Sequence, residues 1–206
     1  MGMFGKVPGN EKPRENPEEG KYPAVLYLLV DLGTHKDEYK GEMKFKRKIH
    51  LGWELVGTKM SDGRPFAVFE EYNVTPSKYD SGFYFPPNSN LHKMLKTWTG
   101  ADEAKCKSAG FLEFLLDEQI PGTITIEHAQ GKKDPSKTYA NIESIKPYKG
   151  VGKLARVNDP VKYLIGGSTD GFPESLTWLK KKIGQALEFN GGVPPQSGDD
   201  NTDIPF

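Results

Sequence analysis

The sequence predicts a mainly β domain, an OB-fold-like five-stranded barrel with a helical insertion between its third and fourth strands. Apolar and polar residues alternate over several long segments, which is the period of a strand. The Asp62-Gly63 turn pair separates two of these segments, and Pro121-Gly122 ends the second predicted helix. Between the third and fourth strands the apolar spacing changes to that of a helix. With 206 residues, the chain can bury a core of its own.

The first predicted strand is "KYPAVLYLLVDLG", in which nearly every position is apolar. A strand with two apolar faces is buried on both sides. Strict alternation would place one set of residues on one face and a second set on the other: Ala24, Leu26, Leu28, Val30 and Leu32 against Val25, Tyr27 and Leu29.

The second predicted strand is "EMKFKRKIHLGWELVG", the longest alternating segment of the chain. One parity is apolar except at Arg47 and should face inward. The other parity should present cations to solvent: Lys44, Lys46, Lys48 and His50. The turn at Asp62-Gly63 then leads into a third strand, "FAVFEEYNVT".

The helical insertion follows the third strand. "SNLHKMLKTWTG" has Ser89 or Asn90 as a cap and Gly100 as a stop, and "SAGFLEFLLDEQIPG" predicts a second short helix. Two more strands, "GTITIEHAQG" and "KTYANIESIKPY", complete the domain. Three strands, a helix and two strands are the order of the OB-fold, a barrel that binds oligonucleotides. A generic α+β sandwich is the alternative.

These elements divide the chain into four parts. We expect a flexible arm over 1–20, the barrel domain over 21–150, and an extension over 151–190 with a helix in "FPESLTWLKKKIGQALEF". Residues 191–206 are predicted to form a linker and a disordered acidic tail.

The sequence offers no set of residues typical of catalysis. Cys106 is the one cysteine, the four histidines lack metal-ligand spacing, and no P-loop, HExxH or Gly-x-Ser-x-Gly pattern occurs. We therefore expect no enzyme activity, cofactor or metal. The chain also lacks a run of about 20 apolar residues and a secretory signal, so we expect no membrane contact and a location in the cytoplasm.

Basic and aromatic residues favour binding of single-stranded nucleic acid, because cations follow the phosphates and rings stack on the bases. The net charge is zero, but basic residues cluster in the second strand and acidic residues gather at the C-terminus. The predicted contacts are Lys44, Lys46, Arg47 and Lys48, with Tyr27, Tyr39, Tyr72, Tyr79, Tyr84 and Tyr139 as stacking rings. The alternative is that the lysines form a solvated face that discourages edge pairing.

The C-terminal "DDNTDIPF" resembles the acidic tip of bacterial single-stranded DNA-binding proteins, which ends Asp-Asp-Asp-Ile-Pro-Phe. The last four residues match that tip, and two earlier acids precede them: Asp203, Ile204, Pro205 and Phe206 after Asp199 and Asp200. In that family the tip recruits replication and repair enzymes, whose pockets take the terminal ring and its α-carboxylate.

The body of the chain looks more like phage-encoded single-stranded DNA-binding proteins of the OB-fold type. The resemblance rests on "YPAVLYLLVDLG", "NSNLHKMLKTWTG" and "YANIESIKPYKG". It implies a role in DNA replication in the cytoplasm of a bacterial host.

The sequence thus predicts a sequence-tolerant single-stranded DNA-binding protein of replication, recombination and repair, whose tip recruits enzymes of these processes. The acids of the tail would also compete with DNA for the cations. Two alternatives stay open: a strand-annealing recombination protein, and an adaptor or virion component that uses the tail without binding DNA.

Overall fold

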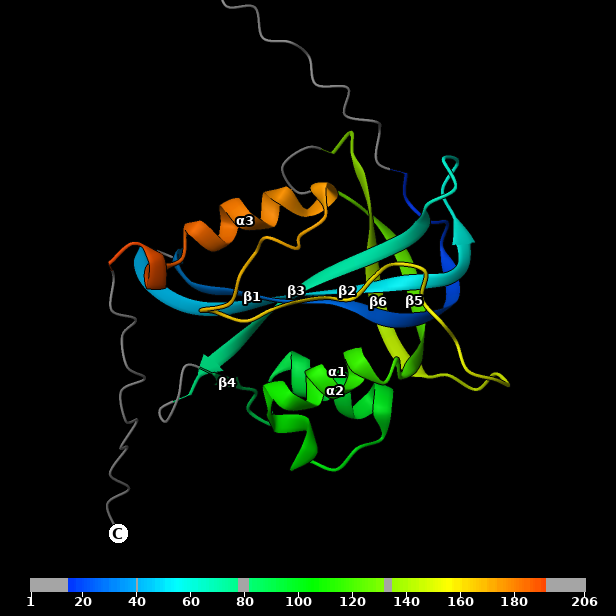
Figure 1. Ribbon diagram of the computed structural model, residues 1–206, viewed down its shortest axis with the longest axis horizontal. Coiled ribbons are helices and arrows are strands. Elements are labelled where there is room, and N and C mark those ends of the chain that lie inside the picture. The colour runs from blue at the N-terminus through cyan, green and yellow to red at the C-terminus, as the bar shows by residue number, and fades with distance from the viewer. Residues whose placement is uncertain (1–14, 40, 78–81, 132–134, 192–206) are drawn as a thin grey trace, which may run out of the picture.

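The fold is one curved β-sheet with helices on both faces (Figure 1). The computed structural model describes residues 15–39, 41–77, 82–131 and 135–191. The predicted arm up to residue 14 and the predicted tail from 192 lie outside the described residues. Within the described part of the chain, no helix is long and apolar enough to cross a membrane.

The sheet is antiparallel and runs in the order β4-β3-β2-β1-β5-β6, with β7 pairing in parallel with β1. This arrangement confirms the mainly β class and the predicted order of the five main strands. The short strand β4 was not predicted, and the segment that contains β7 was predicted only as an extended segment or a late hairpin. The strands are β1 (Gly20–Tyr39), β2 (Glu42–Lys59), β3 (Pro65–Pro76), β4 (Phe83–Tyr84), β5 (Pro121–Gln130), β6 (Thr138–Pro147) and β7 (Val161–Tyr163).

The helices form two layers. The insertion between β3 and β5 packs on one face of the sheet and the C-terminal helix on the other (Figure 1). The α-helices are α1 (Asn90–Thr99), α2 (Ala109–Asp117) and α3 (Thr177–Gly184), and 3₁₀ turns cover Lys105–Lys107, Glu174–Leu176 and Leu187–Phe189.

The first helix begins and ends as its sequence indicates. Ser89 is the N-cap of α1, and its Oγ accepts a hydrogen bond from the backbone N–H of His92 at 3.2 Å. Gly100 ends the helix in the left-handed conformation, with φ of 67°.

The predicted closed barrel is wrong, because the sheet stays open between β3 and β6. These two strands lie side by side, yet no strand pairing joins them among the described residues. On its free edge β1 pairs with β5 over Gly20–Val25 and then with β7 over Leu28–Val30. The β5–β6 hairpin therefore follows only the first part of β1, and residues of β3 and β6 line a groove where the two strands meet without pairing.

Each face of the sheet has its own core. The larger core packs Trp53 of β2 against Trp98 of α1, with ring centroids 6.1 Å apart. The second core, beneath α3, brings Leu179 and Ile183 onto Leu28 of β1.

A β-bulge in β1 divides its residues between the two cores. The register shifts between Leu26 and Leu28, so Leu26 faces the α1 core while Leu28 faces the α3 core. The expectation that these two leucines share a face is therefore wrong. With apolar residues on both sides, the sequence pattern carried no sign of the shift.

The segment 151–190 is bound closely to the sheet. The buried carboxylate of Glu54 accepts hydrogen bonds from the backbone N–H groups of Val157 and Asn158 at 2.7 and 2.8 Å. Arg156 donates to the carbonyl oxygens of Leu26 and Leu116 at 3.0 and 2.6 Å. These bonds lead the chain to β7 and then to α3.

Candidate nucleic-acid interface

A groove of about 990 Å³ runs along β3, between β6 and α3. Its residues come from strands β1, β2, β3 and β6, from the β2–β3 turn, from Asn158, from residues 175–178 at the start of α3, and from residues 15–17. We call it the aromatic groove, after the ring-bearing side chains that line it: Tyr27, His50, Phe66, Phe69, Tyr139 and Trp178.

The rings form a packed base with two exposed rims. The imidazole of His50 stacks on Phe69 with a centroid distance of 5.4 Å and an interplanar angle of 9°. Trp178 of α3 meets His50 edge to face at 5.2 Å. Trp178 and Tyr139 are 48% and 47% exposed. The groove therefore offers two accessible rings, one on α3 and one on β6, above a base of buried and partly buried rings.

A glycine makes room for this base. Gly52 of β2 lies opposite Phe69 of β3, and directly opposite residues share a face of the sheet. A Cβ at Gly52 would lie 2.8 Å from the Phe69 ring, closer than two carbon atoms can pack. Glycine is the residue that lets the Phe69 ring lie on the strand.

The polar residues of the groove include several acids. Glu15, Asp62, Glu70 and Glu71 line it together with Arg64. Burial raises the pKa of Glu70, which accepts a hydrogen bond from the Tyr72 hydroxyl at 2.6 Å. Glu71 forms a hydrogen-bonded ion pair with Lys182 of α3. The phosphates of a polyanion bound in the groove would therefore contact cations mainly at the end of the groove.

Those cations lie on β2, directly beyond the groove. Lys44, Lys46 and Lys48, here called the lysine row, alternate on the same face of β2 as His50. Successive members of one strand face are about 7 Å apart, so the row continues the line of the groove. Lys48 pairs with Asp37 at 2.8 Å and Lys44 with Glu42 at 3.4 Å.

Arg47 does not belong to this surface. Its opposite parity turns it into the core, where its side chain is 7% exposed and its Nη2 lies 2.5 Å from Asp31 Oδ2. It also donates to the Gly82 carbonyl at 2.8 Å and lies over the Phe83 ring. The predicted role of Arg47 in contacting DNA is corrected accordingly, because a buried, ion-paired guanidinium cannot reach phosphate.

The predicted tyrosines are divided among several environments. Tyr139 is exposed at the groove, and Tyr84 is 41% exposed on the short strand β4. Tyr27 and Tyr72 are 7% and 6% exposed, so neither presents a ring face for stacking, and both predicted roles are corrected. The side chain of Tyr39 and the whole of Tyr79 lie outside the described residues, as do the tail residues Asp199, Asp200, Asp203, Ile204, Pro205 and Phe206.

Four rings of the groove lie outside the predicted contacts: Trp178, His50, Phe66 and Phe69. His50 was expected to face solvent as a cation, but it is 5% exposed. Trp178 had a readable signal, since it lies off the apolar stripe of Leu176, Leu179 and Ile183 and is therefore directed away from the helix core. The stacking of His50 on Phe69 depends on strand register, which no local pattern reveals.

Elsewhere the described residues show little that resembles a catalytic or metal centre. No group of three or more His, Cys, Asp or Glu within residues 15–191, apart from the gaps named above, is placed to hold a metal ion. Cys106 is buried, and burial raises the pKa of its thiol.

Comparisons with known proteins do not assign the chain to a family. No protein-family model matches it, and neither a curated protein nor a solved structure gives a match.

Proposed function

We propose that this protein binds single-stranded DNA with little dependence on base sequence, using the aromatic groove and the lysine row. The observation that carries the proposal is the continuity of the two: exposed rings at Trp178 and Tyr139 lead along one face of β2 into Lys48 and Lys46. Bases would stack in the groove while phosphates follow the lysines.

The chemistry of both parts favours a single strand over a duplex. Each stacked base contributes about 1–3 kcal/mol, and stacking requires an unpaired base with an accessible face. Neither rings nor lysines distinguish one base from another, so tolerance of many sequences follows.

We further propose that the sheet is an open relative of the OB-fold. The strand order β3-β2-β1-β5-β6, with helices between β3 and β5, is the order expected for that barrel. The β3–β6 seam is where such a barrel would close, and the aromatic groove lies at this seam. An open seam leaves space for a ligand that a closed one would exclude.

The C-terminal tip would serve a second binding event. In this proposal Ile204, Pro205 and Phe206 enter a pocket on a replication or recombination enzyme, which holds the terminal carboxylate with basic residues. The protein would then coat exposed strands, in the cytoplasm of a bacterial host if it is phage-encoded, and bring enzymes to them.

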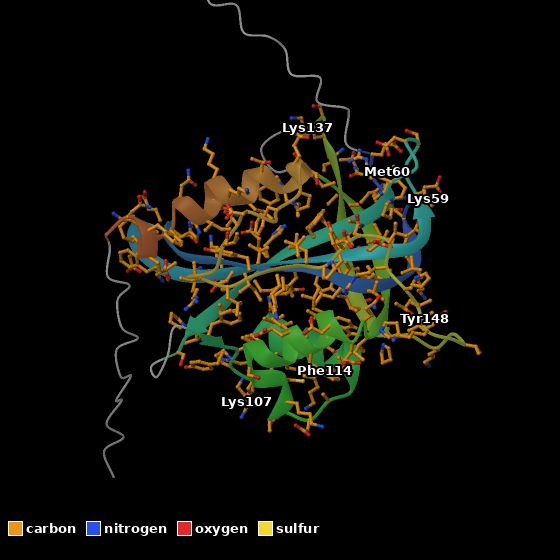
Figure 2. All side chains as sticks on the ribbon, viewed as in Figure 1. Lys59, Met60, Lys107, Phe114, Lys137 and Tyr148 are labelled. Atoms are coloured by element: carbon orange, nitrogen blue, oxygen red, sulfur yellow. The ribbon has the colours of Figure 1, made fainter. Side chains whose placement is uncertain are left out.

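Fluorescence polarisation with labelled oligo-dT at about 50 mM salt tests the DNA-binding proposal. The full chain should bind, and Trp178→Ala should weaken binding by about tenfold, since one stacked base is lost. Phe114→Ala is the matched control: Phe114 is 51% exposed but lies on α2, across the sheet from α3 (Figure 2). It should leave binding unchanged.

Two results would contradict the proposal. Absence of oligo-dT binding by the full chain at this salt concentration would favour an adaptor that uses only its tail. Equal losses in the Trp178 and Phe114 variants would show that the groove is not the site.

A further inference from the structure

Glu71 lies at the junction of the aromatic groove and the lysine row. It stands on β3 directly opposite His50 of β2. Its Oε1 contacts the ammonium of Lys182 on α3 and lies 3.9 Å from Nδ1 of His50. One carboxylate oxygen thus faces nitrogen-bearing side chains from two other elements, at the point where a strand leaving the groove would reach its first cations.

The same arrangement recurs along the row. Asp37 contacts Lys48 at 2.8 Å, and Glu42 contacts Lys44 at 3.4 Å. Three cations of the proposed DNA path, Lys44, Lys48 and Lys182, are therefore paired with carboxylates of the same chain. Of the three acids Glu71, Asp37 and Glu42, Glu71 alone is among the described residues that line the groove.

These pairs are exposed enough to exchange. The side chains of Lys182 and Glu71 are 30% and 33% exposed, and ion pairs in contact with water are weak. A phosphate has the same charge sign as a carboxylate, and it also accepts hydrogen bonds from an ammonium. It can therefore replace Glu71 at Lys182 without leaving a buried charge unpaired.

On the basis of the proposed function, we propose that Glu71 occupies the place of a DNA phosphate in the unbound protein and yields Lys182 to DNA on binding. Glu71 then sets both the affinity and its response to salt. When Lys182 moves to a phosphate, the freed carboxylate attracts a salt cation, which offsets the cation that the phosphate releases. The DNA affinity of the wild type therefore falls less steeply with salt than its number of phosphate contacts alone would predict.

The test is a salt titration of oligo-dT binding by the full chain and its Glu71→Gln variant. Glutamine keeps the size of the side chain and removes the competing charge. The variant should bind about fivefold more tightly at low salt, and its slope of log K against log salt should steepen by about 0.7. The advantage should shrink as salt rises, because screening weakens both effects.

Two further variants separate this role from a structural one. Glu113→Gln is the matched control, since Glu113 pairs with Lys162 at 3.0 Å with a similar exposure but lies away from the groove. It should bind as the wild type does. Lys182→Gln breaks the same ion pair as Glu71→Gln, so a merely structural pair would make the two variants behave alike. The proposal requires opposite results, with weaker binding by Lys182→Gln.

The outcomes also distinguish this inference from the proposed function. If the full chain binds oligo-dT but Glu71→Gln matches or falls below Glu113→Gln, only the inference about Glu71 is overturned. If neither the full chain nor Glu71→Gln binds, both are overturned. Binding by Glu71→Gln with opposite behaviour of Lys182→Gln supports both.

Discussion

At the scale of single residues, neighbouring positions of β2 have opposite roles. Lys46 and Lys48 are half-buried, whereas Arg47 between them is buried against Asp31. The alternation in the sequence already placed Arg47 with the apolar parity, together with Ile49 and Leu51. Its charge suggested DNA contact, but its parity indicated a buried side chain. Position was the better guide.

This buried pair gives a stability prediction. Replacing Arg47 with Met leaves the Asp31 carboxylate buried without its guanidinium partner, which should lower the unfolding free energy by about 3–5 kcal/mol. Urea denaturation measures the loss. Adding Asp31→Asn to Arg47→Met should restore part of it, because the unpaired charge is gone. A single variant as stable as the wild type would show that the pair carries no stability.

At the scale of elements, residues 15–19 connect the two hairpins that flank the open seam. Glu15 accepts hydrogen bonds from the backbone and side chain of Ser61 in the β2–β3 turn. Asn16 donates to the Thr138 carbonyl of β6 at 2.7 Å, and His128 of β5 contacts the Pro17 carbonyl at 2.8 Å. We call these residues the strap. In place of strand pairing, the strap ties one side of the groove to the other.

Removing the strap should therefore loosen the seam. A variant that lacks residues 1–19 should melt a few degrees lower than the full chain and exchange its β6 amide hydrogens faster. A variant that lacks only residues 1–14 keeps the strap and serves as the control. Equal melting temperatures and exchange rates for the two truncations would contradict this role.

The same scale shows why the fold was only partly predictable. The five main strands have long alternating or apolar segments, so local periodicity was enough to find them. The strand β7 has three residues, too few for a period, and forms only because β1 offers a free edge there. The open seam and the β1 bulge likewise depend on long-range packing. The lysine row was predictable from the alternation in the sequence. The stacking of His50 on Phe69 was not, because it depends on the register between β2 and β3.

At the scale of the whole molecule, charge is balanced locally as well as in total. The net charge is zero, and the lysine row carries its own acids at Asp37 and Glu42. Such a protein attracts nucleic acid weakly over long distances. The proposed DNA binding would then depend on short-range contacts, with the rings of the aromatic groove and the exchange of ion pairs contributing most. The acidic C-terminal residues extend this balance to a segment outside the described sheet.

The tail therefore gives the last prediction. Deleting residues 197–206 removes Asp199, Asp200 and Asp203, the acids that we propose compete with DNA for the lysines. The deletion should tighten oligo-dT binding at low salt, with a smaller gain at high salt because screening weakens the competition. Replacing the three aspartates with asparagine should give the same gain while keeping the tail length. Removing Phe206 alone should leave DNA affinity nearly unchanged, since no acidic side chain is lost. If the deletion leaves the DNA affinity unchanged at every salt concentration, the tail does not compete with DNA. Its role would then be limited to binding partner proteins.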